Sequence, residues 1–462
     1  MKKTITGILA SVLVLSMCAS CGTNKENSSG KVELSVGGWP STEGAALQKI
    51  EQQKIDFEAE YQNTAIVPDT WSFDLKTFYP KAEAGLLPNL FGAHFTEVNK
   101  LIDGEYVADL SDALKDNGYY DKLDKKVLDI IAKDGKIYGL PTDVYAVGLA
   151  YNTDMYEAAG LVEADGTPKQ PKDWNEFAEF AVKIKEATGK PGIALTTTNN
   201  TGGWLFTNIA WSYGVDFMEQ DKDGKWKATF NSPEMVEALQ FVSDLKWKYD
   251  VLPDNILIDQ KEQQKLFATG GAGMIISAPI AYNLVKYETD PKMYGMMAIP
   301  AGPKRHVALL GGTINCVSEN STKEQIDLAV KWFDFRGNGV RFDDKVKANI
   351  DQNYETYIAE NRAIGVISMP VWNDNSDKLA YTYEMMEKHY NMKPNAAKLY
   401  NECFNNPDLE IQPEEPICAQ DLYGILDNCI QQVLNHNDVD IRAIVEKANS
   451  EFQTNFLDNI DY

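Results

Sequence analysis

Apolar residues along the chain recur with two spacings, one typical of strands and one typical of helices. Val32, Leu34 and Val36 alternate with polar residues, which predicts a strand that ends at the Gly-Gly-Trp-Pro of residues 37–40. Five stretches follow the helical spacing, with apolar positions at Leu47, Ile50 and Phe57; Trp174, Phe177, Ala181 and Ile184; Val236, Leu239, Val242 and Leu245; Ile326, Ala329, Val330 and Phe333; and Ile441, Ile444, Val445, Ala448 and Phe452. Strands that alternate with amphipathic helices predict an α/β fold.

Polar residues that cap helices mark where several of these elements begin. Asp173 and Ser321 are each followed by a glutamate three residues later, which is the spacing of a capping box. Ser232 precedes Pro233, an arrangement favoured in the first turn of a helix. We therefore expect helices to begin just after these three polar residues.

The first thirty residues differ in character from the rest of the chain. Two lysines precede an apolar stretch from Ile5 to Met17, which is typical of a secretory signal. The Ala19-Ser20-Cys21 that follows is similar to a bacterial lipobox, so we predict a lipoprotein signal peptide over 1–20 and a lipidated Cys21. Residues 21–30 are polar and favour a flexible tether. A plain signal peptide, cleaved without lipidation, is the alternative.

Composition narrows the class of protein. The chain has 462 residues, of which 44 are basic and 68 acidic, giving a formal net charge of −24. Hydrophobic residues make up 44% and charged residues 24%, which is typical of a folded, soluble body. A negative surface repels phosphate backbones, and the sequence has no basic patch, so we expect no nucleic-acid partner.

Four cysteines lie beyond the signal segment. Cys316 stands in an apolar, strand-like run and is expected to be a buried free thiol. Cys403, Cys418 and Cys429 are close in sequence, and a disulfide between two of them stays open at this point. A chain of this length does not depend on disulfides for its core.

The sequence carries no catalytic or metal-binding motif that we identify. Its four histidines have no metal-ligand spacing, and phosphate loops, dinucleotide fingerprints and nucleophile elbows are missing. Residues 219–224 imitate the start of a calcium loop, but Phe230 replaces its final glutamate, so Asp223-Gly224 is better explained as a hairpin turn. We expect no enzyme activity, no cofactor and no metal.

A series of segments carries Gly, Pro and aromatic residues in a defined order. These segments are 85–91 (GLLPNLF), 134–141 (DGKIYGLP), 149–155 (LAYNTDM), 159–161 (AGL), 171–177 (PKDWNEF), 230–234 (FNSPE), 267–274 (FATGGAGM), 299–303 (IPAGP) and 311–313 (GGT). In this order they resemble the family 1 extracellular solute-binding proteins, the receptors of carbohydrate ABC importers. Asn89 and Asp173 depart from the family pattern, which has Asp and Thr there.

The resemblance implies a two-lobed, periplasmic-binding-protein-like α/β fold, similar to maltose-binding proteins, with a central hinge and an interlobe ligand cleft. Lobe 1 would comprise residues 31–143 and 300–345, and lobe 2 residues 146–298 and 350–462. We predict that the polar, proline-interrupted region 342–416 forms short helices and long loops on one lobe.

The same resemblance implies what the protein does. A sugar, expected to be an oligosaccharide, would shift an equilibrium between open and closed lobes, and the closed form would dock on ABC permease subunits. The receptor would be a monomer outside the cytoplasm, anchored to the cell membrane through Cys21.

Aromatic residues among turn-forming neighbours are the first candidates for sugar contacts. A pyranose offers an apolar C–H face to an aromatic ring and hydroxyl groups to polar side chains. Turn or loop residues surround Trp39, Trp71, Trp204 and Trp372. For each of them, packing within a loop is the alternative role.

Position within the family pattern adds a second set of candidates. The resemblance places the hinge near Asp143 and Tyr145, and an aromatic after a Gly-Pro-like pair near Tyr282. Gly312 and Thr313 in the 311–313 motif could present backbone groups to the cleft. His94 follows just after the 85–91 motif. The second set is therefore His94, Asp143, Tyr145, Tyr282, Gly312 and Thr313.

Two other functions stay open from the sequence. One is a receptor for a different solute, such as a peptide, a polyamine or glycerol phosphate. The other is a surface glycan-degrading enzyme, for which a pair of cleft carboxylates with shifted pKa values would be the sign.

Overall fold

The structure of the chain is a computed structural model that describes residues 30–373 and 376–460. The predicted signal peptide, the lipidated Cys21 and the tether before Gly30 therefore lie outside the described residues. Within the described ranges, no helix has the length and apolar character needed to cross a membrane.

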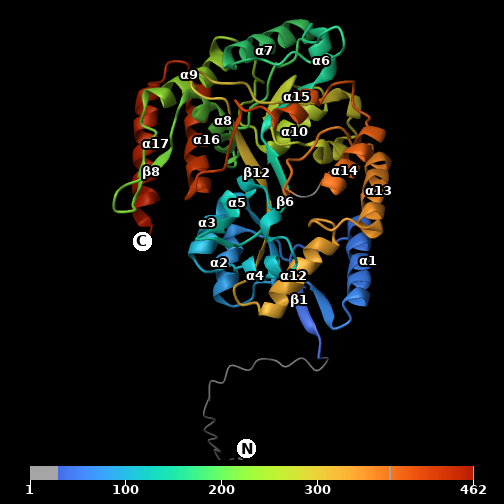
Figure 1. Ribbon diagram of the computed structural model, residues 1–462. Coiled ribbons are helices and arrows are strands. Elements are labelled where there is room, and N and C mark those ends of the chain that lie inside the picture. The colour runs from blue at the N-terminus through green and yellow to red at the C-terminus, as the bar shows by residue number, and fades with distance from the viewer. Residues whose placement is uncertain (1–29, 374–375, 461–462) are drawn as a thin grey trace, which may run out of the picture.

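Two separate clusters of buried side chains divide the fold into two lobes, seen at the bottom and top of Figure 1. The lobe 1 cluster runs from Leu34 to Val144 and from Leu310 to Trp372. The lobe 2 cluster runs from Ala146 to Leu309 and from Met392 to Leu457. The chain is therefore two-lobed, as the sequence predicts.

A six-stranded mixed sheet in the order β13-β12-β3-β1-β2, with β6 also paired to β12, forms the base of lobe 1. Its edge strand β13 pairs with residues 307–309 at the lobe 2 end of β12. β1 is parallel to β2 and β3, whereas β12 is antiparallel to both β3 and β6. The strands are β1 (Val32–Val36), β2 (Thr64–Pro68), β3 (Leu90–His94), β6 (Leu140–Ala146), β12 (Val307–Val317) and β13 (Glu410–Gln412).

Helices and one small hairpin complete lobe 1. They are α1 (Ala45–Glu60), α2 (Leu75–Glu83), the 3-10 helix η1 (Phe95–Glu97), α3 (Val98–Asp103), α4 (Ser111–Asp116), α5 (Lys125–Ile131), β4 (Ala132–Lys133), β5 (Lys136–Ile137) and α12 (Lys323–Phe335). Short 3-10 turns also occur in both lobes, at Tyr120–Lys122, Val285–Tyr287, Pro291–Met293 and Leu457–Asn459.

Lobe 2 packs helices around a three-stranded antiparallel sheet in the order β10-β7-β11. Its strands are β7 (Gly148–Asn152), β10 (Met274–Ser277), β11 (Tyr294–Met297) and the hairpin β8 (Met218–Gln220) with β9 (Trp226–Ala228). Its helices are α6 (Thr153–Ala158), α7 (Trp174–Thr188), α8 (Thr201–Tyr213), α9 (Pro233–Trp247), α10 (Gln260–Ala268), α11 (Ala281–Leu284), α15 (Lys398–Cys403), α16 (Ala419–Asn435) and α17 (Ile441–Asn455).

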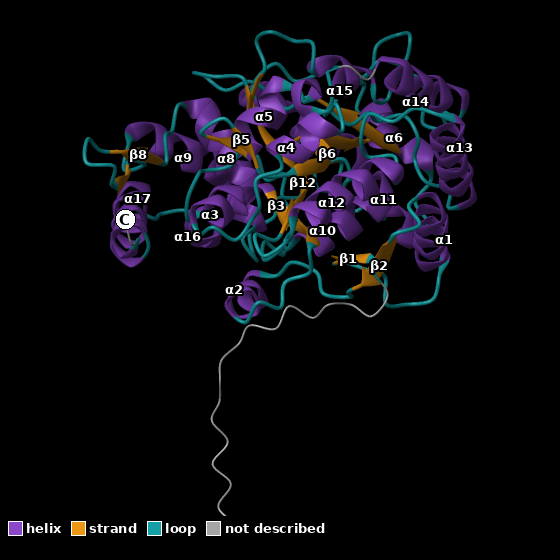
Figure 2. Cartoon of the chain, turned by 60° about the horizontal axis from the view of Figure 1, so that its bottom comes forward, coloured by secondary structure: helices purple, strands orange, loops and turns teal. Residues whose placement is uncertain are grey.

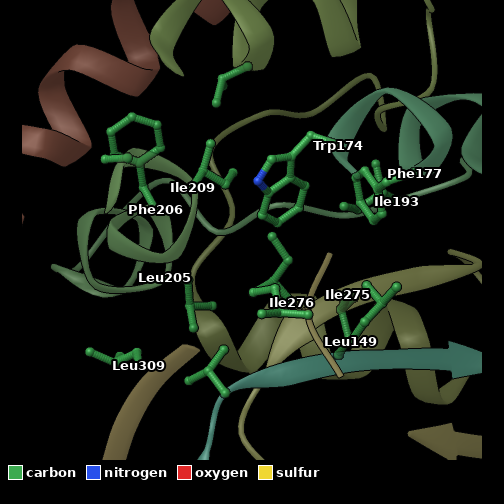
Figure 3. Packing of buried hydrophobic residues seen from close by; sticks show 14 of the residues in the cluster. Leu149, Trp174, Phe177, Ile193, Leu205, Phe206, Ile209, Ile275, Ile276 and Leu309 are labelled. Carbon is green, nitrogen blue, oxygen red and sulfur yellow. The ribbon is translucent and has the colours of Figure 1, made fainter. Parts of the chain in front are cut away.

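The core of lobe 2 follows from the helical spacing seen in the sequence. Figure 3 shows the Trp174 indole next to Ile209 of α8 and above Ile276 of β10. Asp173 caps α7 by accepting hydrogen bonds from the backbone of residues 175 and 176 at 2.9 Å, and Gly189 ends it in the left-handed region with φ +68°. Local sequence therefore sets both ends of a helix whose inner face is buried.

Helices α13 (Asp344–Ala359) and α14 (Ser376–Lys388) form a separate unit with its own small apolar cluster. Figures 1 and 2 both show α13 beside α1. Arg341 pairs with Glu60 at 3.0 Å, and Lys49 donates to Asn353 at 2.5 Å. These contacts attach the α13–α14 unit to lobe 1. The prediction of short helices in this region is wrong, because α13 alone has 16 residues.

Several local predictions are confirmed and one is shifted. The strand at 32–36, the caps at Asp173 and Ser232 and the hairpin around Asp223 are present. Thr322, and not Ser321, caps α12, since Thr322 and Gln325 form a reciprocal capping box. The four described cysteines are buried, and none of them forms a disulfide bond within the described residues.

The lobe boundaries differ from the sequence-based ones in two places. Residues 307–309 pack in lobe 2, because β12 is one long strand that runs through both lobes. Met369 and Trp372 pack in lobe 1, because the chain returns there after α13 and Met369 N–H bonds Val144 at 2.9 Å. The boundary that the sequence places between residues 298 and 300 therefore falls between Leu309 and Leu310.

Candidate functional site

A cavity of about 410 Å³ lies between the lobes, against the crossover strands β6 and β12. Residues of both lobes line it: Phe73, Asp74, Lys76, His94 and Phe95 of lobe 1; Tyr145, Gly311 and Gly312 of the crossover strands; and Asn199, Asn200, Thr201, Trp204, Glu414, Gln420 and Tyr423 of lobe 2. We call it the interlobe cavity.

The lobe 1 wall combines an aromatic ring with polar groups. The Phe73 and His94 rings meet edge to face, with centroids 5.6 Å apart. Asp74 caps α2 by accepting a hydrogen bond from the Lys76 backbone at 3.0 Å, which fixes the loop that carries Phe73. Trp71 lies behind Phe73, and its indole N–H donates to Thr77 at 3.1 Å.

The crossover strands contribute the Tyr145 side chain and the backbone of Gly311 and Gly312. Gly311 pairs with Tyr145 in the β6–β12 ladder, and a Cβ on Gly311 would lie 2.4 Å from the Tyr145 ring. Only glycine lets the ring lie against the strand at this point. Asp143 pairs with Thr313 two residues further along the same ladder. Tyr145 therefore lies at the place where the chain passes between lobes.

The lobe 2 wall is organised by one buried carboxylate. Asp427 of α16 accepts hydrogen bonds from the backbone N–H groups of Asn200 and Gly203, each at 2.7 Å. Burial raises the pKa of Asp427, while these backbone donors oppose that shift. Asn200 adopts φ +65° and donates from its amide to the Gln420 carbonyl at 3.0 Å. These bonds fix the start of α8, four residues before Trp204.

Close packing of α8 on α16 brings the remaining lining residues together. A Cβ on Gly202 would lie 2.5 Å from Asp427, and one on Gly203 would lie 2.2 Å from the Tyr423 carbonyl oxygen. Burial, with Glu414 and Glu415 nearby, raises the pKa of Tyr423 well above its usual range, so its hydroxyl stays protonated. The Tyr423 side chain is fully buried, so Trp204 is the aromatic ring that lobe 2 offers to a ligand, beside the amides of residues 199, 200 and 420.

The chemistry of this arrangement is that of a binding site. Aromatic rings from both lobes can cover an apolar face, while amide, hydroxyl and carboxylate groups can bond hydroxyl groups at its rim. Among the described residues, no group of three or more His, Cys, Asp or Glu could hold a metal ion.

Four of the ten predicted ligand-binding residues line the interlobe cavity: His94, Tyr145, Trp204 and Gly312. Asp143 and Thr313 lie next to it on the crossover strands. Trp71 supports its wall from behind. Tyr282 lies outside it, with 66% of its side chain exposed and the Arg362 guanidinium 5.5 Å from its ring.

The structure corrects the prediction for Trp39 and Trp372, which are only 4% and 5% exposed. Gly38, at φ +69°, turns the chain so that the Trp39 ring stacks on Trp332, and its indole N–H donates to Glu51 at 2.9 Å. The Trp372 indole N–H donates to the Asn338 carbonyl at 2.9 Å inside lobe 1. Both rings belong to the lobe 1 core.

The residues that α16 brings to the cavity are not among those predicted from the sequence. Gln420 and Tyr423 lie on one amphipathic helix whose apolar face is buried in lobe 2, so its spacing indicates only core packing. The adjacent Asn199 and Asn200 carried a usable signal. Asparagine tolerates the left-handed region that both residues occupy. The two residues stand five and four positions before Trp204, which is about one helical turn.

The fold and this cavity define a two-lobed solute-binding protein whose site lies where the lobes meet. The family model for bacterial extracellular solute-binding proteins matches residues 38–335. The chain belongs to this family, whose members serve ABC transporters as solute receptors.

Two relatives and one solved structure illustrate the similarity. A putative binding protein of Brucella abortus is 26% identical over 388 residues, covering 82% of this chain and 86% of the relative. The maltodextrin-binding protein MdxE of Bacillus subtilis is 26% identical over 350 residues, covering 73% and 77%. An ABC substrate-binding protein of Listeria monocytogenes in complex with cycloalternan has a TM-score of 0.66 at 17% identity, covering 92% and 99%, which supports the fold.

Proposed function

We propose that this chain is a lipid-anchored receptor that captures an oligosaccharide between its lobes and delivers it to the permease of an ABC importer. The observation that carries the proposal is the composition of the interlobe cavity, which is lined by Trp204 of lobe 2 and by Phe73 of lobe 1. Aromatic rings on both sides suit the C–H faces of sugar rings. The maltodextrin-binding relative supports the same ligand class.

Ligand binding would couple to lobe closure through the crossover strands. A solute that contacts Phe73 on lobe 1 and Trp204 on lobe 2 makes its full set of contacts only when both walls are close. It therefore favours the closed arrangement by its differential affinity for the two states. We propose that the closed monomer then docks on the permease.

Calorimetric titration of the purified chain with a glycan panel tests the ligand class. We expect an oligosaccharide to bind, to change tryptophan fluorescence and to be recovered unchanged after prolonged incubation. Binding of only a peptide, a polyamine or glycerol phosphate would contradict the sugar proposal. Protein-dependent cleavage of a glycan would favour an enzyme.

The anchor proposal rests on the Ala19-Ser20-Cys21 signal. Full-length protein expressed in a bacterium should partition with membranes, and Cys21→Ala should release it or leave the precursor uncleaved. Mass spectrometry of the mature N-terminal peptide decides the question, because an unmodified cysteine there excludes lipidation.

A further inference from the structure

A second cavity, of about 330 Å³, lies on the side of β6 that faces the α13–α14 unit. Thr142 of β6 lines it, only three residues before Tyr145 of the interlobe cavity. Three residues of a strand span about 10 Å. Figures 1 and 2 show α13 and α14 on one side of β6 and α3 and α16 on the other. The two cavities therefore flank the crossover strands at short range.

The charged side chains that line the second cavity are of one sign, and Asp334, outside the lining, lies close enough to Lys378 to raise its pKa against the lowering effect of burial. Among the described residues that line it, Arg362 and Lys378 are cations and none is a carboxylate. The interlobe cavity, in contrast, has Asp74 and Glu414 against Lys76. In a chain with a net charge of −24, a cavity whose lining carries two cations and no carboxylate favours anions over cations.

Arg362 is positioned with its hydrogen-bond donors available. Its guanidinium lies 4.2 Å from the centroid of the Tyr357 ring and 5.5 Å from that of Tyr282. No carboxylate of the described residues forms an ion pair with it. A guanidinium that stacks on aromatic rings leaves the N–H groups in its plane available. These donors have the fork geometry that fits a carboxylate or a phosphate.

Lys378 adds a second, fixed positive charge. Its ammonium donates to the backbone carbonyls of Gly337 and Gly339, the latter at 2.6 Å. Burial lowers the pKa of Lys378 to about 8, so most of the population stays charged at neutral pH. The two carbonyls hold the ammonium in place before any ligand arrives.

We propose that the second cavity binds the anionic group of an acidic saccharide, a carboxylate or a phosphate, through the Arg362 guanidinium and the charge of Lys378. This inference rests on the proposed function and narrows its ligand to an acidic saccharide, either a uronic acid or a sugar phosphate. Tyr282, the exposed aromatic of lobe 2, contacts Arg362 from the opposite lobe, so the anion site forms where the α13–α14 unit meets lobe 2.

Calorimetric titrations with matched probes test this inference. The probes are an oligouronide against a neutral oligosaccharide of equal length, and glucose 6-phosphate against glucose. We expect the wild-type protein to prefer one acidic probe over its neutral partner, with an affinity that falls as salt is added. The probe pair that shows the preference identifies the anion as carboxylate or phosphate.

Arg362→Met should lower the affinity for that acidic probe by roughly 10- to 100-fold, as for a lost charge-assisted hydrogen bond, and leave the neutral probe unchanged. Arg442→Met, which removes the same charge from an exposed position on α17, is the matched control and should change neither affinity. Melting temperatures of both variants check that they fold.

The outcomes separate this inference from the proposed function. If the neutral oligosaccharide binds and no acidic probe is preferred, or if Arg362→Met binds the acidic probe as tightly as the wild type, the anion site is overturned and the sugar receptor stands. If no saccharide of either kind binds, both proposals fail.

Discussion

Gly203 of α8 lies so close to Tyr423 of α16 that a Cβ at position 203 would come within 2.2 Å of the Tyr423 carbonyl oxygen. The contact is between backbones, so a longer side chain cannot be accommodated by a rotamer change. It places Trp204 and Tyr423, which come from helices more than 200 residues apart in sequence, on one wall of the interlobe cavity.

Gly203→Ala should therefore destabilise the protein by about 1–3 kcal/mol, the usual cost of overpacking, and weaken ligand binding as α8 shifts. Denaturant unfolding and calorimetric titration measure the two effects. Gly44→Ala is the matched control, because no atom lies within 4 Å of its added Cβ. Equal stability of the two variants would contradict the close packing.

Trp204 and Trp39 should respond in opposite ways to truncation. Trp204→Ala removes a half-buried ring from the cavity wall and should weaken sugar binding by about 2–3 kcal/mol, or roughly 30- to 100-fold. Trp39→Ala opens a hole beside Trp332 and should cost about 3–5 kcal/mol of stability. Affinity and melting temperature, measured for both variants, distinguish the roles. Normal binding by a stable Trp204→Ala variant would remove Trp204 from the site.

The two tryptophans also show where sequence analysis succeeds and where it ends. The strand at 32–36 and helix α7 were predictable, because spacing and caps are local properties. Trp39 and Trp204 both follow glycine pairs, and only the path of the chain after each pair distinguishes them. Gly38 directs Trp39 into the core, whereas Gly203 packs on α16 and leaves Trp204 at the cavity.

Contacts between segments that are far apart in the sequence could not be predicted from local residue patterns. Tyr423 reaches the cavity through packing between α8 and α16, and residues 369–372 join lobe 1 through contacts with β6. Such contacts depend on the whole fold. The crossover near Tyr145 was found only because family motifs flank it.

Glu415 should make stability depend on pH. It is 8% exposed and accepts a hydrogen bond from the Trp211 indole at 3.0 Å. Burial, reinforced by Asp216, raises its pKa from 4.5 to about 7. The folded state therefore holds a proton that the unfolded state releases between these values. Stability from this group is complete below about pH 4.5 and is lost as pH rises to about 7, by roughly 3 kcal/mol.

Unfolding free energies at about pH 5 and pH 8 measure this dependence. Glu415→Gln should flatten it, because the amide does not titrate and can still accept from Trp211. Glu355→Gln, an exposed carboxylate on α13, should leave it unchanged. An equally steep dependence in Glu415→Gln would assign the proton to another group.

Substitution of Gly311 should change the affinity for sugar by displacing the Tyr145 ring. A Cβ on Gly311 would lie only 2.4 Å from the Tyr145 ring. Gly311→Ala should therefore displace the ring and lower sugar affinity by about tenfold. Tyr145→Ala should also weaken binding, because the ring lines the cavity. In the Tyr145→Ala background the added methyl group meets no ring, so Gly311→Ala should cause no further loss. A double-mutant cycle by calorimetry measures this coupling, and additive losses would show that Gly311 acts on the cavity by a route other than Tyr145.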